Sequence, residues 1–364
     1  MIENKTEQLC YGYNPVTEKN VYLNRKELTV PHGMVIGDED IEKINFINKE
    51  ILNVADNTHD KITIIQKTEN KYNSLLDNIN GVCYTLKNNA DICLNVLDAP
   101  PNLDMDFYDS FVFHKISVLV SLYQLFYLHG KDITASEMYM ISECCKEVYR
   151  PYFKSYDKDL KEFDRNKVPT LVDFLLTWEN KFPNNMFTPH FKKFKNYVLS
   201  SLKCFSSHTN IKYMNNSVEL YDVSNLYNEN INDAPLLLIT ECLWNKIYFY
   251  KPLKYRRLYI EGLDTLFVND EILEPVANIW SQADRYRVIM TGICENAENL
   301  YKCDISKNYW TVTSFICILS IQQPLLDKLS HTLLINDKLK KYLEKGGERS
   351  ALLDTGVGMV PIKF

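Results

Sequence analysis

The chain has 364 residues and a mass of 42.6 kDa, with 46% apolar and 24% charged residues. This composition excludes a disordered protein and allows a full hydrophobic core, in one large domain with an insertion or in two domains. The formal net charge of −6 argues against a dedicated nucleic-acid binder with a broad basic face, although it leaves room for a local basic patch.

No apolar run approaches the roughly 20 residues that a membrane-spanning helix needs. The polar start, Met1 to Lys5, lacks a secretory signal. The ten cysteines include no C-x-x-C pair and have no histidine partner nearby, so we expect free thiols and no zinc site. The sequence therefore predicts a soluble, cytoplasmic protein without a metal.

Hydrophobic periodicity divides the chain into three segments. Residues 20–97 alternate strand-like runs, such as 62–65 and 81–86, with one clear helix between them. From about 103 to 205 the strand signal vanishes, and three segments are typical of amphipathic helices: 111–128, 135–149 and 170–178. Strand-like runs return, with helices between them, at 218–223, 257–260, 286–290 and 313–319.

This order predicts an α/β fold with a mainly parallel central sheet, because strands that alternate with helices tend to pair in parallel. Residues 1–102 and 206–364 are expected to form the two parts of one α/β domain. Residues 103–205 are expected to form an inserted all-helical subdomain.

Gly37 to Ile44 lie where a strand runs into a helix, which is the setting of a phosphate-binding loop. The pattern G-x-x-x-x-G-K-[ST] uses two glycines to let the backbone approach phosphates, a lysine for the outer phosphates and a hydroxyl for magnesium. Here Gly37 and Lys43 keep their places, but Glu42 takes the second glycine position and Ile44 the hydroxyl position. The pattern indicates a vestigial nucleotide site.

The charge of this loop opposes phosphate binding. Four acids, residues 38, 39, 40 and 42, against Lys43 give a local balance of minus three. Each like-charge contact at about 4 Å costs roughly 1 kcal/mol in water and about 4 kcal/mol at a partly buried site. Because carboxylates are favoured at helix N-termini, Asp38 or Asp40 is expected to cap the helix where a phosphate would otherwise bind. An ordinary acidic helix start, never derived from a nucleotide site, is the alternative.

Short segments along the whole chain resemble one family in order and spacing. They are Tyr11-Gly12-Tyr13-Asn14, residues 31–37, residues 147–153, residues 169–173, Thr209-Asn210, Tyr221-Asp222-Val223 and Trp244-Asn245-Lys246. In these segments the chain resembles the C-terminal motor domain of the VirB-type (TraE/TraC-like) conjugation ATPases of type IV secretion systems. The resemblance implies a RecA-like P-loop NTPase fold.

The family's second acidic motif is altered here. In active members an apolar strand ends in Asp-Glu, where the aspartate steadies magnesium and the glutamate activates water. The corresponding strand of this chain ends in Glu261-Gly262, so a longer acid takes the magnesium position and the water-activating carboxylate is missing. Asp264 is not expected to replace that carboxylate.

Three further family positions are altered or displaced. Glu295 stands where the family's glutamine senses the terminal phosphate. After the second strand the resemblance implies an aspartate and an acidic pair. This chain has Gln66-Lys67-Thr68-Glu69 there. The basic position before the later strand, which the resemblance implies acts on a neighbouring subunit's nucleotide, is represented by Arg285 or Arg287.

These combined losses remove every part that phosphoryl transfer uses. They predict a pseudo-ATPase that binds no cofactor and serves as a structural or regulatory subunit of a DNA-transfer machine. Its expected partners are other type IV secretion or conjugation proteins, such as an active relative, through which it meets the membrane. One alternative is an atypical ATPase that binds Mg-ATP through Lys43, Glu261 and a partner's arginine.

A DNA-binding accessory factor is the other alternative. A helix near the end of the insertion carries Lys192, Lys193, Lys195 and Lys203 among aromatic residues. This pattern is typical of a solvated helix face, although a nucleic-acid contact would look similar.

Overall fold

The computed structural model describes residues 7–89, 91–99, 108–128, 132–154, 165–211, 216–227, 233–250 and 253–364. Its strands form one sheet in the order β2-β1-β11-β10-β9-β3-β8-β7-β4-β6-β5. The strands are β1 Leu9–Asn14, β2 Lys19–Leu23, β3 Gly33–Ile36, β4 Lys61–Gln66, β5 Val82–Thr85, β6 Val218–Asp222, β7 Arg256–Glu261, β8 Val288–Ile293, β9 Phe315–Ile318, β10 Ser350–Asp354 and β11 Met359–Lys363.

The sheet is parallel from β9 through β3, β8, β7, β4 and β6 to β5. The remaining pairs, which involve β1, β2, β10 and β11, are antiparallel. The prediction of a mainly parallel α/β sheet is therefore confirmed, and each of the predicted strands 62–65, 81–86, 218–223, 257–260, 286–290 and 313–319 overlaps an observed strand.

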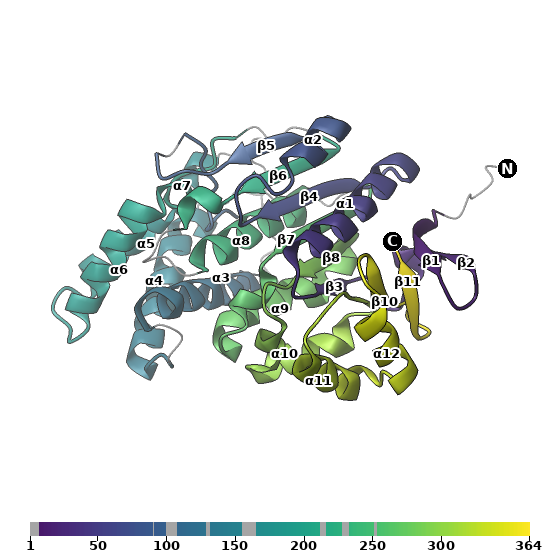
Figure 1. Ribbon diagram of the computed structural model, residues 1–364. Coiled ribbons are helices and arrows are strands. Elements are labelled where there is room, and N and C mark those ends of the chain that lie inside the picture. The colour runs from purple at the N-terminus through teal and green to yellow at the C-terminus, as the bar shows by residue number, and fades with distance from the viewer. Residues whose placement is uncertain are drawn as a thin grey trace.

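Helices cover both faces of this sheet (Figure 1). They are α1 Asp40–Asn57, α2 Asn73–Ile79, α3 Tyr108–Tyr123, α4 Ala135–Lys154, α5 Leu171–Lys181, α6 Thr188–Ser201, α7 Lys203–Ser206, α8 Ala234–Tyr250, α9 Asp270–Ala283, α10 Asp304–Asn308, α11 Gln323–Leu333 and α12 Asp337–Lys345. Apolar side chains of α1 and α2 pack on one face, and those of α8 and α9 pack on the other. The strands are buried on both faces, which explains their near-continuous apolar runs.

Between β5 and β6 the described residues include the helices α3 to α7 and no strand. Figure 1 shows this helical part beside the sheet, at the end opposite β1 and β2. The division at residues 102 and 205 stays a prediction, and its first boundary falls among residues 100–107, outside the described residues. Among the described residues no helix is long and apolar enough to cross a membrane.

A fully buried ionic network fixes the amino-terminal ends of the central strands. The Glu50 carboxylate, on α1, accepts hydrogen bonds from Tyr11 Oη at 2.9 Å, Arg25 Nη1 at 2.9 Å and Arg257 Nη1 at 3.3 Å. Arg257 also donates to Asp60 at 3.0 Å, and Arg25 donates to the Met290 carbonyl on β8 at 3.1 Å. Because all of these groups are buried, each charge depends on its partners for the solvation that water would otherwise supply.

Glu50→Gln is expected to destabilise the protein by about 3–5 kcal/mol, because it leaves two buried guanidinium groups without their shared anion. Urea unfolding measures the change. Glu179→Gln is the control, since Glu179 pairs with Lys195 at the exposed surface and its loss should cost less than about 1 kcal/mol. A Glu50→Gln variant as stable as this control would contradict the central place of the network.

Candidate functional site

Parallel pairing brings the sequence-predicted site residues to one edge of the sheet. β3 leads into Gly37, β7 ends at Glu261, and β8 leads into Cys294 and Glu295. Glu261 lies opposite Ile293 in the register of β7 and β8. The loop that follows β4 reaches the same edge with Lys67 and Lys71. The carboxyl ends of parallel strands are where such folds place their ligands.

Lys43, the only basic residue among residues 37–44, is turned toward the protein itself. Its Nζ donates to the Cys294 carbonyl at 2.8 Å and lies 3.0 Å from Asp40 Oδ1. The Lys43 side chain is 3% exposed. Its ammonium is therefore already satisfied by a backbone oxygen and a carboxylate of this chain.

The other loop positions do not form a phosphate cradle. The half-buried Ile44 supplies no oxygen for a metal ion. Gly37 is needed for packing, because a Cβ there would lie 2.8 Å from the Leu319 Cβ after β9. Glu42 directs its carboxylate to backbone N–H groups of Ser320 at 3.4 Å and Arg349 at 3.2 Å.

The expectation that Asp38 or Asp40 caps α1 is wrong. Glu39 is the N-cap residue of α1, and its side chain makes no capping hydrogen bond. Asp38 instead accepts from the backbone N–H of Gln322 at 2.7 Å, directly before α11. Asp40 lies in the first turn of α1, where an acid favours the helix dipole, but its carboxylate binds two lysines. Asp38 and Asp40 thus bind neighbouring segments of the chain.

Glu261 is bound on both of its carboxylate oxygens. Oε2 accepts from the backbone N–H groups of Lys67 at 2.7 Å and Thr68 at 3.1 Å. Oε1 lies 2.5 Å from Lys71 Nζ. The side chain is 2% exposed, so this acid anchors the loop after β4.

Glu295 belongs to a second ion-pair group at this edge. Lys67 Nζ lies 3.1 Å from Glu295 and 2.8 Å from Asp233. Burial lowers the pKa of the Lys67 ammonium, but the two carboxylates outweigh it and leave that pKa raised. Burial raises the pKa of Glu295, against the opposing effect of Lys67. Gly262 must lack a side chain, because it has a φ of +71° and a Cβ there would lie 2.6 Å from Glu295 Oε1.

Asp264 also has a structural role. Its carboxylate accepts from the backbone N–H groups of Glu295 at 2.7 Å and Asn296 at 2.9 Å, and from Asn299 Nδ2 at 2.9 Å. Burial is the main reason that its pKa is raised. The carboxylate thus anchors the loop after β8.

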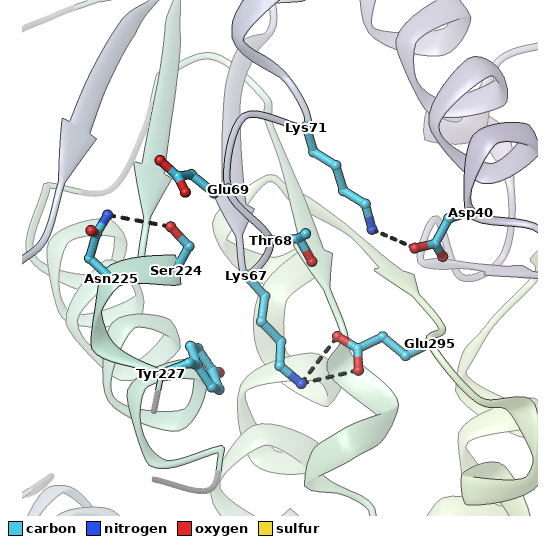
Figure 2. Close-up of a pocket in the computed structure, with 9 residues that line it drawn as sticks. All are labelled: Asp40, Lys67, Thr68, Glu69, Lys71, Ser224, Asn225, Tyr227 and Glu295. Carbon is cyan, nitrogen blue, oxygen red and sulfur yellow. Dashed lines mark hydrogen bonds and ion pairs between the residues drawn. The ribbon is translucent and has the colours of Figure 1, made fainter. Parts of the chain in front are cut away.

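A cavity of about 610 Å³ opens beside these ion pairs. Figure 2 shows Lys67 directed toward Glu295 and Lys71 directed toward Asp40, with Ser224, Asn225 and Tyr227 across the opening. The two cations that border the cavity are thus already paired with carboxylates.

Arg285 and Arg287 lie at the other end of β8. Both are exposed, and Arg287 donates to the Leu253 carbonyl. β8 has six residues, which span roughly 20 Å, so neither arginine reaches Glu295 of its own chain. Their action on a neighbouring subunit stays a prediction.

The residues present do not fit a magnesium nucleotide. The loop lysine is bound to a backbone carbonyl, the helix start carries acids, and an ammonium lies on the acid in the metal position. Within the part of the chain that the structure describes, no group of three or more His, Cys, Asp or Glu side chains is arranged to hold a metal ion.

Comparison with solved structures shows the same fold in conjugation ATPases. The chain is similar to VirB4 of Thermoanaerobacter pseudethanolicus, with a TM-score of 0.81 and 13% identity over 99% of this chain and 97% of the other. It is also similar to the bacterial coupling protein TrwBΔN70 in its unbound form, with a TM-score of 0.59 and 11% identity over 99% and 89% of the two chains. For TrwB in complex with ADP and Mg²⁺ the TM-score is 0.56, at 11% identity over 98% and 93%.

Neither protein-family models nor curated proteins give a match. At these identities the likeness establishes the fold. The chain has the RecA-like P-loop NTPase fold that the sequence resemblance implied, over nearly its whole length.

Sequence reasoning missed the partners of the altered acids. The sequence patterns did not single out Lys71 or Asp233, and they included Lys67 only as part of the segment 66–69. One signal was available: Lys67 and Lys71 follow directly on the strand 61–66, whose carboxyl end meets that of its parallel neighbours. Charged residues at that place are candidates for a shared site.

Asp38→Ala is expected to destabilise the protein by about 1 kcal/mol, because the N–H of Gln322 loses its acceptor. Glu39→Ala is the matched control, since the neighbouring side chain makes no capping bond and its loss should change stability by less than about 0.5 kcal/mol. Urea unfolding of both variants checks this order. If Glu39→Ala were the more destabilising of the two variants, the stabilising acid would be Glu39 and not Asp38.

Proposed function

We propose that this chain is a non-hydrolysing relative of the conjugation ATPases that acts as a structural or regulatory subunit of a DNA-transfer machine. The proposal is carried by the contacts that the loop lysine and the strand-end acid make within the chain. Lys43 is held by the Cys294 carbonyl, and Glu261 is held by Lys71 and two backbone N–H groups.

Energetics support the inactive role over an atypical ATPase. A polyphosphate could reach Lys43 only by displacing Asp40 and meeting the other acids of the loop. Each uncompensated like-charge contact at about 4 Å costs roughly 1 kcal/mol in water and about 4 kcal/mol when partly buried. The lost water-activating carboxylate and phosphate sensor would then still leave no hydrolysis.

The shared fold supports the proposal that the machine is a type IV secretion or conjugation system. A shape shared over 99% of this chain and 97% of VirB4 would let the protein occupy a place beside a similar motor domain. Its proposed partners are other type IV secretion or conjugation proteins, including an active ATPase relative. The proposed location is the cytoplasm, at the membrane face only through those partners.

The DNA-binding alternative has less support. Phe191, Phe194 and Tyr197 of α6 are buried in the helical core, so they are not available to stack on bases. Lys192 and Lys193 are exposed, and Lys195 pairs with Glu179 at 2.6 Å. This arrangement is a solvated face over a packed aromatic side.

Isothermal calorimetry with millimolar Mg-ATP is expected to show no saturable binding, and phosphate release is expected to equal that of buffer. Saturable binding that disappears in Lys43→Ala would overturn the proposal in favour of the atypical ATPase. An active P-loop ATPase, measured in parallel, serves as the positive control. The double variant Glu42→Gly/Ile44→Ser tests whether the loop alone prevents nucleotide binding. We expect this variant to remain inactive, because Glu261 and Glu295 are unchanged.

A further inference from the structure

Lys71 joins two acids that come from different parts of the fold. It lies in the loop between β4 and α2, and its Nζ is 2.5 Å from Glu261 Oε1 and 3.1 Å from Asp40 Oδ2. Glu261 ends β7, and Asp40 lies in the first turn of α1. A single ammonium thus bridges the end of one strand and the start of the helix that follows residues 37–39. Figure 2 shows the contact of Lys71 with Asp40.

This position has a counterpart in P-loop enzymes in general. There a divalent metal ion is held between a hydroxyl at the start of that helix and an acid at the end of a neighbouring strand. In this chain Ile44 replaces the hydroxyl, while Asp40 adds a second carboxylate on the helix side. Two carboxylates facing each other require a cation between them, because their mutual repulsion is otherwise uncompensated.

The charge states agree with this arrangement. Burial lowers the pKa of the Lys71 ammonium, but Glu261 and Asp40 outweigh it, so that its pKa is raised. Burial raises the pKa of Asp40, but Lys43 and Lys71 outweigh that effect and leave its pKa lowered. The Lys71 ammonium and the Asp40 carboxylate therefore favour their charged forms at neutral pH. Lys43 lies 3.0 Å from Asp40, and Lys71 lies 3.1 Å from Asp40 and 2.5 Å from Glu261, so two ammonium groups face these two carboxylates.

We infer that Lys71 is a built-in cation that takes the place of a divalent metal ion between Asp40 and Glu261. The inference rests on the proposed function, because it explains how the site holds together without a magnesium nucleotide. The ammonium ties the start of α1 to the end of β7 at all times, whereas a bound metal would come and go with its nucleotide. A divalent cation and Lys71 therefore exclude each other at this place.

Removal of Lys71 should open the place to a divalent cation, and Mn²⁺ is the probe because its free form is counted by electron paramagnetic resonance. We expect Lys71→Ala to bind one Mn²⁺ about tenfold more tightly than the wild-type chain. Its melting temperature should rise with Mn²⁺ and fall again with a chelator, since a ligand of the folded state stabilises it. The wild-type melting temperature should not respond.

Two further variants locate the effect. Lys71→Ala/Glu261→Gln should lose the gained Mn²⁺ affinity, because the strand-end carboxylate is gone. Lys328→Ala removes a lysine from an exposed pair with Glu298 and should gain nothing. A folded Lys71→Ala variant without gained affinity would overturn the inference, and so would a wild-type chain that binds Mn²⁺ as tightly as the variant.

Failure of Lys71→Ala to fold is also decisive. Folding that is recovered with Mn²⁺ supports the inference, whereas a chain that stays unfolded with and without Mn²⁺ contradicts it. Lys71→Met repeats the measurement with most of the apolar stem retained. These assays contain no nucleotide, so their failure is distinct from a failure of the proposed function, which Mg-ATP calorimetry on the wild-type chain decides.

Discussion

The parallel register of β3, β8, β7 and β4 is the constraint on which the site depends. It places the ends of these strands side by side, so whatever residue follows each strand must coexist with its neighbours in a small space. In this chain those residues are mostly charged, and the edge of the sheet is stable only if they neutralise one another. Lys67 and Lys71, both from the loop after β4, supply that neutralisation for Glu295 and Glu261.

The same constraint explains why the altered positions form one system. In a P-loop protein, loss of the Ser or Thr hydroxyl alone would weaken the metal site and leave the phosphate cradle intact. Here Lys71 links Glu261, at the end of β7, to Asp40 in the first turn of α1. Lys43 in turn binds Asp40 and the Cys294 carbonyl. Because each group has its partner within the chain, a single substitution would not free them all. The network at this edge has to be rearranged as a whole.

Several parts of this structure followed from the sequence because their signals are local. The buried parallel strands and the long amphipathic helices produce strong periodicity. The phosphate-loop pattern at Gly37, Glu42, Lys43 and Ile44 depends on spacing alone and stays a prediction. The antiparallel β1, β2, β10 and β11 were not identified as strands, because short edge strands with mixed polarity lack a clear period.

Other features are invisible in a single sequence because they depend on tertiary contacts. Arg25, Glu50 and Arg257 are of types that usually lie at the surface, yet all three are fully buried. Glu50 on α1 pairs with Arg25, which follows β2, and with Arg257 on β7. The wrong cap prediction has the same origin: Asp38 is adjacent to α1 in sequence, but the N–H group that needs it lies before α11. Helix-capping rules use only the residues next to a helix, whereas the backbone N–H group that an acid binds is set by the tertiary fold.

Charges fix the central strands at both ends. Near the start of β7, Arg257 is bound by Glu50 and Asp60, and at its end Glu261 is bound by Lys71 and two backbone N–H groups. β8 is held in the same way, by Arg25 at the Met290 carbonyl and by Lys43 at the Cys294 carbonyl. A motor that senses its nucleotide needs contacts at this edge that break when phosphate leaves. Contacts supplied by the chain itself persist through any such cycle, so the strands stay in one arrangement, which is what a subunit that contributes shape to an assembly requires.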